Sequence, residues 1–325
     1  MLPATCPIRS IVAGCIASVA LLACGGDEDE LPGTAPDAIA TPEQVRAHLT
    51  FVMSQAPIPR VDHMGALPLM VPAPFACTAS GSLEVGTDTR DSPYTEEPLA
   101  VESIRYRDCV RFDGPPTDPG SAITRLHGVE QSARVQSATD TTITYVGSGT
   151  TAGPLERQVR ANAQNGTYEE DHHLFRRIDG RERQAFFGFL HEVGASVFIT
   201  HELSIRYPDG ASFAGSYRIG SEAAPLIVSS RNNAMRIDGA YEISTTQCRT
   251  GSMHVETVRE LAYDTRTSRF TGGQLRFTTE GGTATAVFTR NGSVRLHGAD
   301  GTELVEPWQM PMVPWDSTCF AAEGP

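Results

Sequence analysis

The densest group of residues able to bind a metal or move a proton lies in the middle of the chain. It is an unbroken acidic and histidine run followed by two His-Glu pairs, at positions 169–173, 191–192 and 201–202. Carboxylate and imidazole groups are ligands for divalent metals and also work as general acids and bases. Neighbouring side chains on a strand point to opposite faces, so His172 and His173 cannot both serve one site without a bulge. Polar residues on a partly solvated sheet face are the favoured interpretation, with Glu170, His172 and His191 as weak candidate metal ligands.

The metal hypothesis depends on the hairpin expected to hold these residues. Asp179-Gly180 is a strong two-residue turn signal, and a turn there would place Arg177 opposite Glu182 as an ion pair across the strands. In that register His172 and His191 lie on the same face of the hairpin. The expected geometry therefore allows a shared site but does not require one.

Motifs of known catalytic chemistry are missing from the sequence. It contains no GxSxG elbow, no HExxH pair, no glycine-rich phosphate loop and no EF-hand loop. Catalytic groups can come from separate parts of a chain, so this absence lowers the expectation of an enzyme without removing it. We expect no catalytic residues and no cofactor.

The amino-terminal residues have the pattern of a secretory signal. Arg9 is the only charged residue before Asp27, and residues 11–23 form an apolar run that is too short for a membrane-spanning helix of about 20 residues. The run ends in Leu21-Leu22-Ala23-Cys24. A second match, ending at Cys15, lies too close to Arg9 to leave an apolar run, and a plain signal peptide with an incidental cysteine is the alternative.

These four residues resemble the lipobox of bacterial lipoproteins. The resemblance implies cleavage before Cys24, acylation of its thiol and amino group, and stable attachment to a membrane through more than one acyl chain. In Gram-negative relatives an aspartate after the cysteine retains the protein at the inner membrane. Gly25 at this position implies the outer membrane, and the sequence leaves open which face of that membrane the protein occupies.

Charge excludes one class of partner. The chain has a formal charge of −13, and loss of residues 1–23 removes Arg9 and no acidic residue. Nucleic-acid binding is therefore not expected, because it needs clustered positive charge. Every basic residue is arginine, which is typical of a GC-rich genome, so arginine alone is not a sign of anion recognition here.

Cysteine usage agrees with export. Cys77, Cys109, Cys248 and Cys319 remain once the signal is removed and Cys24 is acylated. An even number in an oxidising compartment predicts two disulfides, for which three pairings exist. Local loop closure favours Cys77 with Cys109 and Cys248 with Cys319.

Four segments follow from composition and hydrophobic pattern. They are a signal peptide at 1–23, a flexible acidic tether at 24–40, a helix with a proline-rich extended segment at 41–76, and an antiparallel β domain at 77–325. Thr41 and Gln44 form a capping box that starts a helix reaching about Gln55. Val45, Leu49 and Val52 share its buried face.

Alternating residues and turn signals predict β structure in the remainder. Strands are expected at 82–85, 104–112, 142–146, 274–279, 283–290, 293–297 and 302–305. Turns are expected at 179–180, near Gly194, and at 209–210, 238–239, 281–282, 291–292 and 300–301. The predicted fold is mainly β: an antiparallel meander forming one large curved sheet, a sandwich or a partly open barrel, with one short helix.

The mature domain loosely resembles uncharacterised β-rich lipoproteins of Gram-negative bacteria. The matching residues are Cys77 before a strand, Tyr-Arg-Asp-Cys at 106–109, Gly-Gly-Gln-Leu at 272–275, Val-Arg-Leu at 294–296 and Asp-Gly at 300–301. The resemblance implies no activity. The expected function is that of a lipid-anchored binding or structural module, and the alternatives are a carrier of apolar ligands and a metal-dependent hydrolase.

Overall fold

The computed structural model describes residues 39–55, 76–114, 121–136, 140–150, 152–163, 166–184, 191–245, 251–264, 267 and 269–308. Predictions for the signal, Cys24, Cys248 and Cys319 therefore lie outside the described residues. Within the described ranges, no helix has the length and apolar character needed to cross a membrane.

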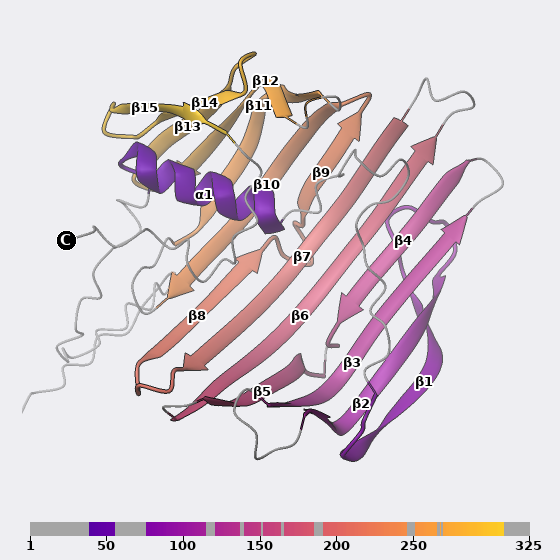
Figure 1. Cartoon of the computed structure of the whole chain (residues 1–325). Helices are drawn as coiled ribbons and strands as arrows, with labels where there is room; N and C mark the ends of the chain where they lie inside the picture. The colour runs from indigo at the N-terminus through magenta and orange to yellow at the C-terminus, as the bar shows by residue number, and fades with distance from the viewer. Residues whose placement is uncertain are drawn as a thin grey trace, which may run out of the picture. The chain divides into compact units, whose positions relative to one another are not determined.

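The described strands form one antiparallel sheet, which confirms the predicted fold class (Figure 1). The amino-terminal strands are β1 (Ser80–Arg90), β2 (Leu99–Asp113), β3 (Ala122–Gln136), β4 (Thr141–Ser148), β5 (Leu155–Ala163), β6 (Gly166–Gln184) and β7 (His191–Arg206). The others are β8 (Ser212–Ile219), β9 (Leu226–Arg231), β10 (Ala234–Thr245), β11 (Met253–Asp264), β12 (Arg269–Thr279), β13 (Gly282–Phe288), β14 (Ser293–His297) and β15 (Glu303–Pro307).

Two positions in the sheet are each shared by two short strands that lie end to end. Between β3 and β6, the first position holds β4 against residues 176–183 of β6 and β5 against residues 166–174. Between β7 and β10, the second holds β9 against residues 192–197 of β7 and β8 against residues 199–206. The connections between these short strands, residues 149–150 and 152–154 in one case and 220–225 in the other, therefore lie beside the long β6–β7 pair.

Helix α1 (Pro42–Gln55) covers part of one face of this sheet, near the carboxyl-terminal strands (Figure 1). Its predicted capping box is confirmed: the Thr41 amide donates to Gln44 Oε1 at 2.9 Å, and the Gln44 amide lies 3.5 Å from Thr41 Oγ1. The predicted face, Val45, Leu49 and Val52, is buried in the main hydrophobic core. We call the side of the sheet against α1 the helix face and the opposite side the far face.

The predicted carboxyl-terminal meander is confirmed. Strands β12 to β15 pair in chain order, and backbone hydrogen bonds close the turns at 291–292 and 300–301. The predicted turn at 209–210 also connects two strands, since the Tyr207 amide donates to the Ala211 carbonyl. In each case the turn joins two strands that follow each other in the sequence. The turn residues were therefore sufficient to predict the hairpin.

The turns predicted at Asp179-Gly180 and near Gly194 are wrong. Both positions lie inside long strands: Asp179 pairs with Ser196, and Gly180 pairs with Ala195. Consequently Arg177 lies opposite Phe198 rather than Glu182. Pairing with β4 and β7 on both sides holds Asp179-Gly180 extended, so the long-range ladder outweighs the local turn propensity.

The turn predicted at Asp238-Gly239 is also wrong. The two residues lie in β10, where the register with β11 shifts between Met235 and Gly239. Gly239 has φ +155, and a Cβ atom there would approach Leu226 Cα to 2.7 Å. The glycine is therefore required by an irregular strand pairing. An Asp-Gly sequence alone does not distinguish such an irregularity from a turn.

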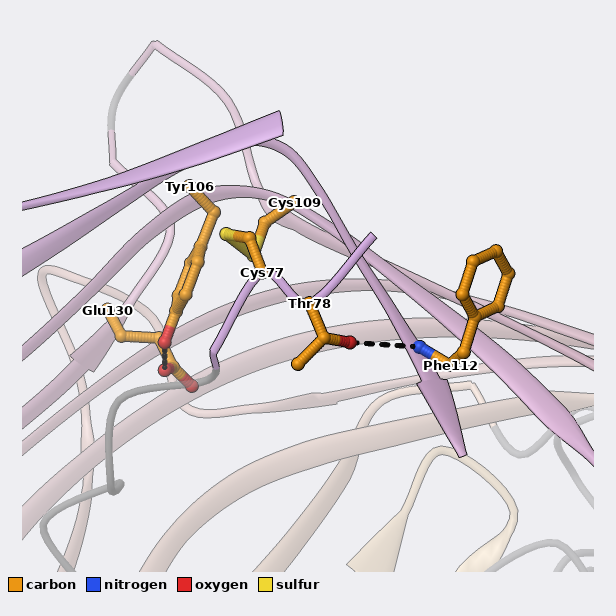
Figure 2. Close-up of a disulfide and its surroundings, with 6 residues drawn as sticks. All are labelled: Cys77, Thr78, Tyr106, Cys109, Phe112 and Glu130. Carbon is orange, nitrogen blue, oxygen red and sulfur yellow. Dashed lines mark hydrogen bonds between the residues drawn. A yellow bond between two sulfur atoms is a disulfide. The ribbon is translucent and has the colours of Figure 1, made fainter. Parts of the chain in front are cut away.

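The predicted disulfide between Cys77 and Cys109 is confirmed, with a sequence separation of 32. Figure 2 shows it beside Tyr106, whose hydroxyl lies 3.0 Å from Glu130 Oε2. The register of β2 on β3 shifts between Tyr106 and Cys109, with Asp108 at φ +50 between them. This bulge puts both Tyr106 and Cys109 into one small hydrophobic cluster.

Candidate functional site

The far face of β6 and β7 carries a strip of polar and aromatic side chains at the centre of the sheet. We call it the β6–β7 strip. Its paired residues are His173 with Glu202, Phe175 with Thr200, Arg177 with Phe198, and Asp179 with Ser196. The Phe175 and Phe198 rings contact each other with centroids 5.2 Å apart.

Cavities lie at both ends of this strip, beside the two shared strand positions. A cavity of about 390 Å³ lies between His173, Glu202 and the connecting residues 150 and 152–154. A second, of about 320 Å³, lies between Asp179, Phe198 and the 220–225 loop. A third, of about 300 Å³, continues past Tyr94 to Arg181 and Gly194. The residues that connect the short strands thus line the cavities beside the strip.

Asp179 is the least exposed charged group in the second cavity. Its residue is 2% exposed. Its Oδ2 accepts a hydrogen bond of 3.0 Å from Arg177 Nε, and Ser92 also hydrogen-bonds this side chain. Burial raises the pKa of this carboxyl, and the nearby Arg177 and Ser92 oppose the effect. Arg177 and Ser92 therefore hold this buried carboxylate beside the cavity.

The loop between β1 and β2 closes the far-face site. Arg177 donates a hydrogen bond of 2.7 Å to the Asp91 carbonyl, which ties this loop to β6. Tyr94 packs over Gly194, where a Cβ would lie 3.4 Å from its hydroxyl. Burial and the charge of Asp179 raise the pKa of Tyr94. The glycine interpreted from sequence as a turn residue instead lies within β7, next to the Tyr94 ring.

The helix face of the same strands holds a separate polar cluster. His172 Nδ1 lies 2.9 Å from His201 Nε2, the two rings are stacked, and Glu170 contacts Nε2 of His172. Burial, followed by the charge of His172, lowers the pKa of His201 to about 4. His201 is therefore neutral at neutral pH.

Arg176 continues this cluster along β6. Its guanidinium donates to Ser148 Oγ at 3.1 Å, and its Nε has no hydrogen-bond partner. Burial lowers the pKa of Arg176, and the nearby Glu130 opposes that effect. Because Glu130 already binds Tyr106, the cluster links β2, β3, β4 and β6 across the helix face.

The structure brings together two of the three weak metal candidates. Glu170 and His172 are in contact, whereas His191 Nε2 lies 3.0 Å from Glu182. His172 pairs with Leu203, twelve residues along β7 from His191, a separation of about 40 Å. The expected register was therefore wrong. Among the described residues no group of three or more His, Cys, Asp or Glu side chains is arranged to hold a metal ion.

Sequence reasoning missed Asp179, Arg177 and Phe198. The Asp-Gly pair was interpreted as a turn, which removed Asp179 from the strand. The available signal was the alternation from His173 through Asp179, which places every second side chain on one face. No protein-family model, curated protein or solved structure matches this chain.

Proposed function

We propose that the protein is an exported lipoprotein, acylated at Cys24 and held at the outer membrane, whose sheet binds a small ligand on the β6–β7 strip. The observation that carries the binding role is the row of cavities along this strip, with the buried Asp179 carboxylate at the wall of one. Largely preformed concave sites with a few directed polar groups are the usual form of small-molecule sites.

Two features support the proposed location. Leu21-Leu22-Ala23-Cys24 has the residue types of a lipobox at the end of an apolar run. The Cys77–Cys109 disulfide is typical of proteins that fold in an oxidising compartment. The first 38 residues are outside the described structure, so the location rests on sequence and on this disulfide.

The location is tested by replacing Cys24 with serine. We expect the wild-type chain to incorporate radiolabelled palmitate and to sediment with outer membranes, and Cys24→Ser to lose both properties. Cys15→Ser is the matched control, because Cys15 ends the rival motif and is expected to leave with the signal. Membrane retention and labelling of Cys24→Ser would contradict the proposal, and loss of labelling in Cys15→Ser would assign the anchor to the rival motif.

A further inference from the structure

We propose that the protein forms a two-fold dimer in which β1 pairs antiparallel with β1 of a second copy, with Val85 at the two-fold axis. The sheets of the two copies then continue into each other across this edge, as in other cases of strand addition. This inference goes beyond the binding role and the lipid anchor proposed above, because it rests on a different part of the sheet.

The two outer strands of the sheet differ in how open they are to pairing. Strands β1 and β15 end the strand order, so each leaves one edge without a neighbouring strand among the described residues (Figure 1). β15 has five residues and ends at Pro307, and its Glu306 contacts Arg46 of α1 at 3.2 Å. Short length, proline and charge are usual means of keeping an edge unpaired. β1 has eleven residues and no proline, so it can accept another strand.

The start of β1 is fixed to β2 by covalent and polar contacts. Cys77 is bonded to Cys109, and the Phe112 amide donates a hydrogen bond of 3.3 Å to Thr78 Oγ1 (Figure 2). A strand that is already held extended loses little further conformational freedom when it pairs. The edge is therefore preorganised for a partner strand.

Val85 is the apolar contact at the centre of this edge. Every residue of β1 is exposed or half-buried, and Val85 is 52% exposed. It pairs with the buried Ile104 and lies on the same face as Leu83, which packs on the small cluster beside the disulfide. Covering an exposed apolar side chain is favourable. In the proposed dimer the two Val85 side chains cover each other, so the clusters of the two copies become neighbours.

The charges of β1 do not oppose a second identical strand. Asp88 contacts Arg105 at 2.8 Å, and Glu84 contacts Arg107 at 3.3 Å. Both arginines come from β2, so each copy carries its own compensation for the two carboxylates. The edge is therefore suited to a copy of itself although the whole chain has a formal charge of −13.

The positions of these carboxylates select the register. A two-fold axis through the sheet keeps each side chain on its own face, so directly opposite residues of the two copies have numbers that sum to an even value. With Val85 on the axis, Glu84 faces Gly86 and Asp88 faces Ser82 of the second copy. Moving the axis back by one residue sets Glu84 against Glu84, and moving it forward by one sets Glu84 against Asp88. Like charges directly opposite each other disfavour both alternatives.

An axis through Thr87 is the remaining alternative. It sets Glu84 opposite Arg90, but the Arg90 Nε already donates a hydrogen bond of 2.9 Å to Gln131 Oε1 on β3. It also leaves Val85 opposite a threonine instead of a second valine. The apolar contact therefore favours the axis through Val85.

Sedimentation equilibrium of the full chain in density-matched detergent measures the dimer. We expect Val85→Lys to weaken dimerisation by about 10-fold, because it replaces an apolar contact with two like charges at the axis. Val305→Lys is the matched control, since Val305 is also 52% exposed but lies on β15, and it should leave dimerisation unchanged. A wild-type chain that stays monomeric at about 100 μM, or equal effects of the two variants, would overturn the inference.

Cysteine cross-linking tests the register. Val85→Cys and Thr87→Cys are each oxidised with copper phenanthroline in the full chain, and linked peptides are identified by mass spectrometry. Opposite residues of an antiparallel pair lie about 4.5 to 5.5 Å apart, within disulfide range, whereas the two copies of position 87 would be about 13 Å apart. We therefore expect position 85 to link to itself and position 87 not to. Any other pattern would overturn the inference, and labelling of Cys24 with palmitate is read independently of it.

Discussion

The hydroxyl oxygen of Tyr241 lies 3.0 Å from His48 Nδ1, a hydrogen bond between α1 and the middle of β10 that spans 193 positions of sequence. Both residues are almost completely buried, at 2% and 1% exposure. Burial raises the pKa of Tyr241 well above its ordinary value, so the phenol remains neutral and donates or accepts according to the tautomer of His48. This contact joins the helix to the sheet inside the core.

Replacing Tyr241 with phenylalanine removes this contact while keeping the ring. We expect a loss of about 1 to 3 kcal/mol in the free energy of unfolding, because a buried nitrogen of His48 loses a partner. Urea denaturation monitored by tryptophan fluorescence measures the change. Tyr207→Phe is the matched control, since Tyr207 is 39% exposed, and its effect should stay within about 0.5 kcal/mol. Equal losses in the two variants would contradict the role of the Tyr241 hydroxyl.

Removing the Cys77–Cys109 disulfide should destabilise the protein by about 3 to 4 kcal/mol. The disulfide closes a loop with a sequence separation of 32, and the loss follows from the greater freedom of the unfolded chain. The double variant Cys77→Ser and Cys109→Ser is compared with wild type by urea denaturation without reductant. Peptide mapping under non-reducing conditions provides the direct check, and finding Cys77 linked to Cys248 or Cys319 would show the pairing to be wrong.

Thr41→Ala should weaken the start of α1 by about 0.5 to 2 kcal/mol, because the side-chain oxygen that caps the helix is lost. Thr41→Ser keeps that oxygen and should remain within a few tenths of a kcal/mol of wild type. Chemical denaturation measures both variants. The capping role would be excluded if serine and alanine proved equally destabilising.

Acidification should destabilise the fold through His201. The pKa of His201 falls from 6.5 to about 4 on folding, so between these values the unfolded chain binds more protons than the folded one. The stability is therefore complete above pH 6.5 and is lost as pH falls towards 4, by about 3 kcal/mol. Denaturation midpoints at pH 7, 6, 5 and 4 measure this loss.

The matched variants for this pH effect are His201→Gln and His254→Gln. The first should show a smaller loss of stability between pH 6.5 and 4, because the buried titrating group is gone. The second replaces an exposed histidine on β11 and should follow the wild-type curve. Identical pH profiles for wild type and His201→Gln would mean that another group causes the acid sensitivity.

Local signals predicted the parts of the fold whose contacts are local. The capping box at Thr41, the turn at Asn291-Gly292 and the Cys77–Cys109 pair each join residues that are close in sequence, and all three are confirmed. The signals failed at Asp179-Gly180, where strands from two other parts of the chain hold the backbone extended. Sequence pattern does not reveal which distant strands will become neighbours.

The candidate site was missed for the same reason. Asp179 and Phe198 come together only when β6 pairs with β7 in the observed register, and the 220–225 loop reaches them because β8 and β9 share one position in the sheet. By contrast, Glu170 and His172 are two residues apart on one strand. Their contact follows from strand alternation, and the sequence predicted their shared face correctly.

The two shared positions in the sheet separate what must stay fixed from what is free to vary. The long strands β6 and β7 keep one register along their whole length, whereas the segments at 149–154 and 220–225 each join strands that are already held by longer neighbours on both sides. Gly149 and Gly220 are fixed, because a Cβ atom there would lie 3.0 Å and 2.6 Å from neighbouring backbone, but the residues that follow Gly220 up to position 224 can be exchanged without shifting a strand pairing. The ligand preference of the strip can therefore change through substitutions in these two connections. The register of β6 on β7 stays the same while this happens.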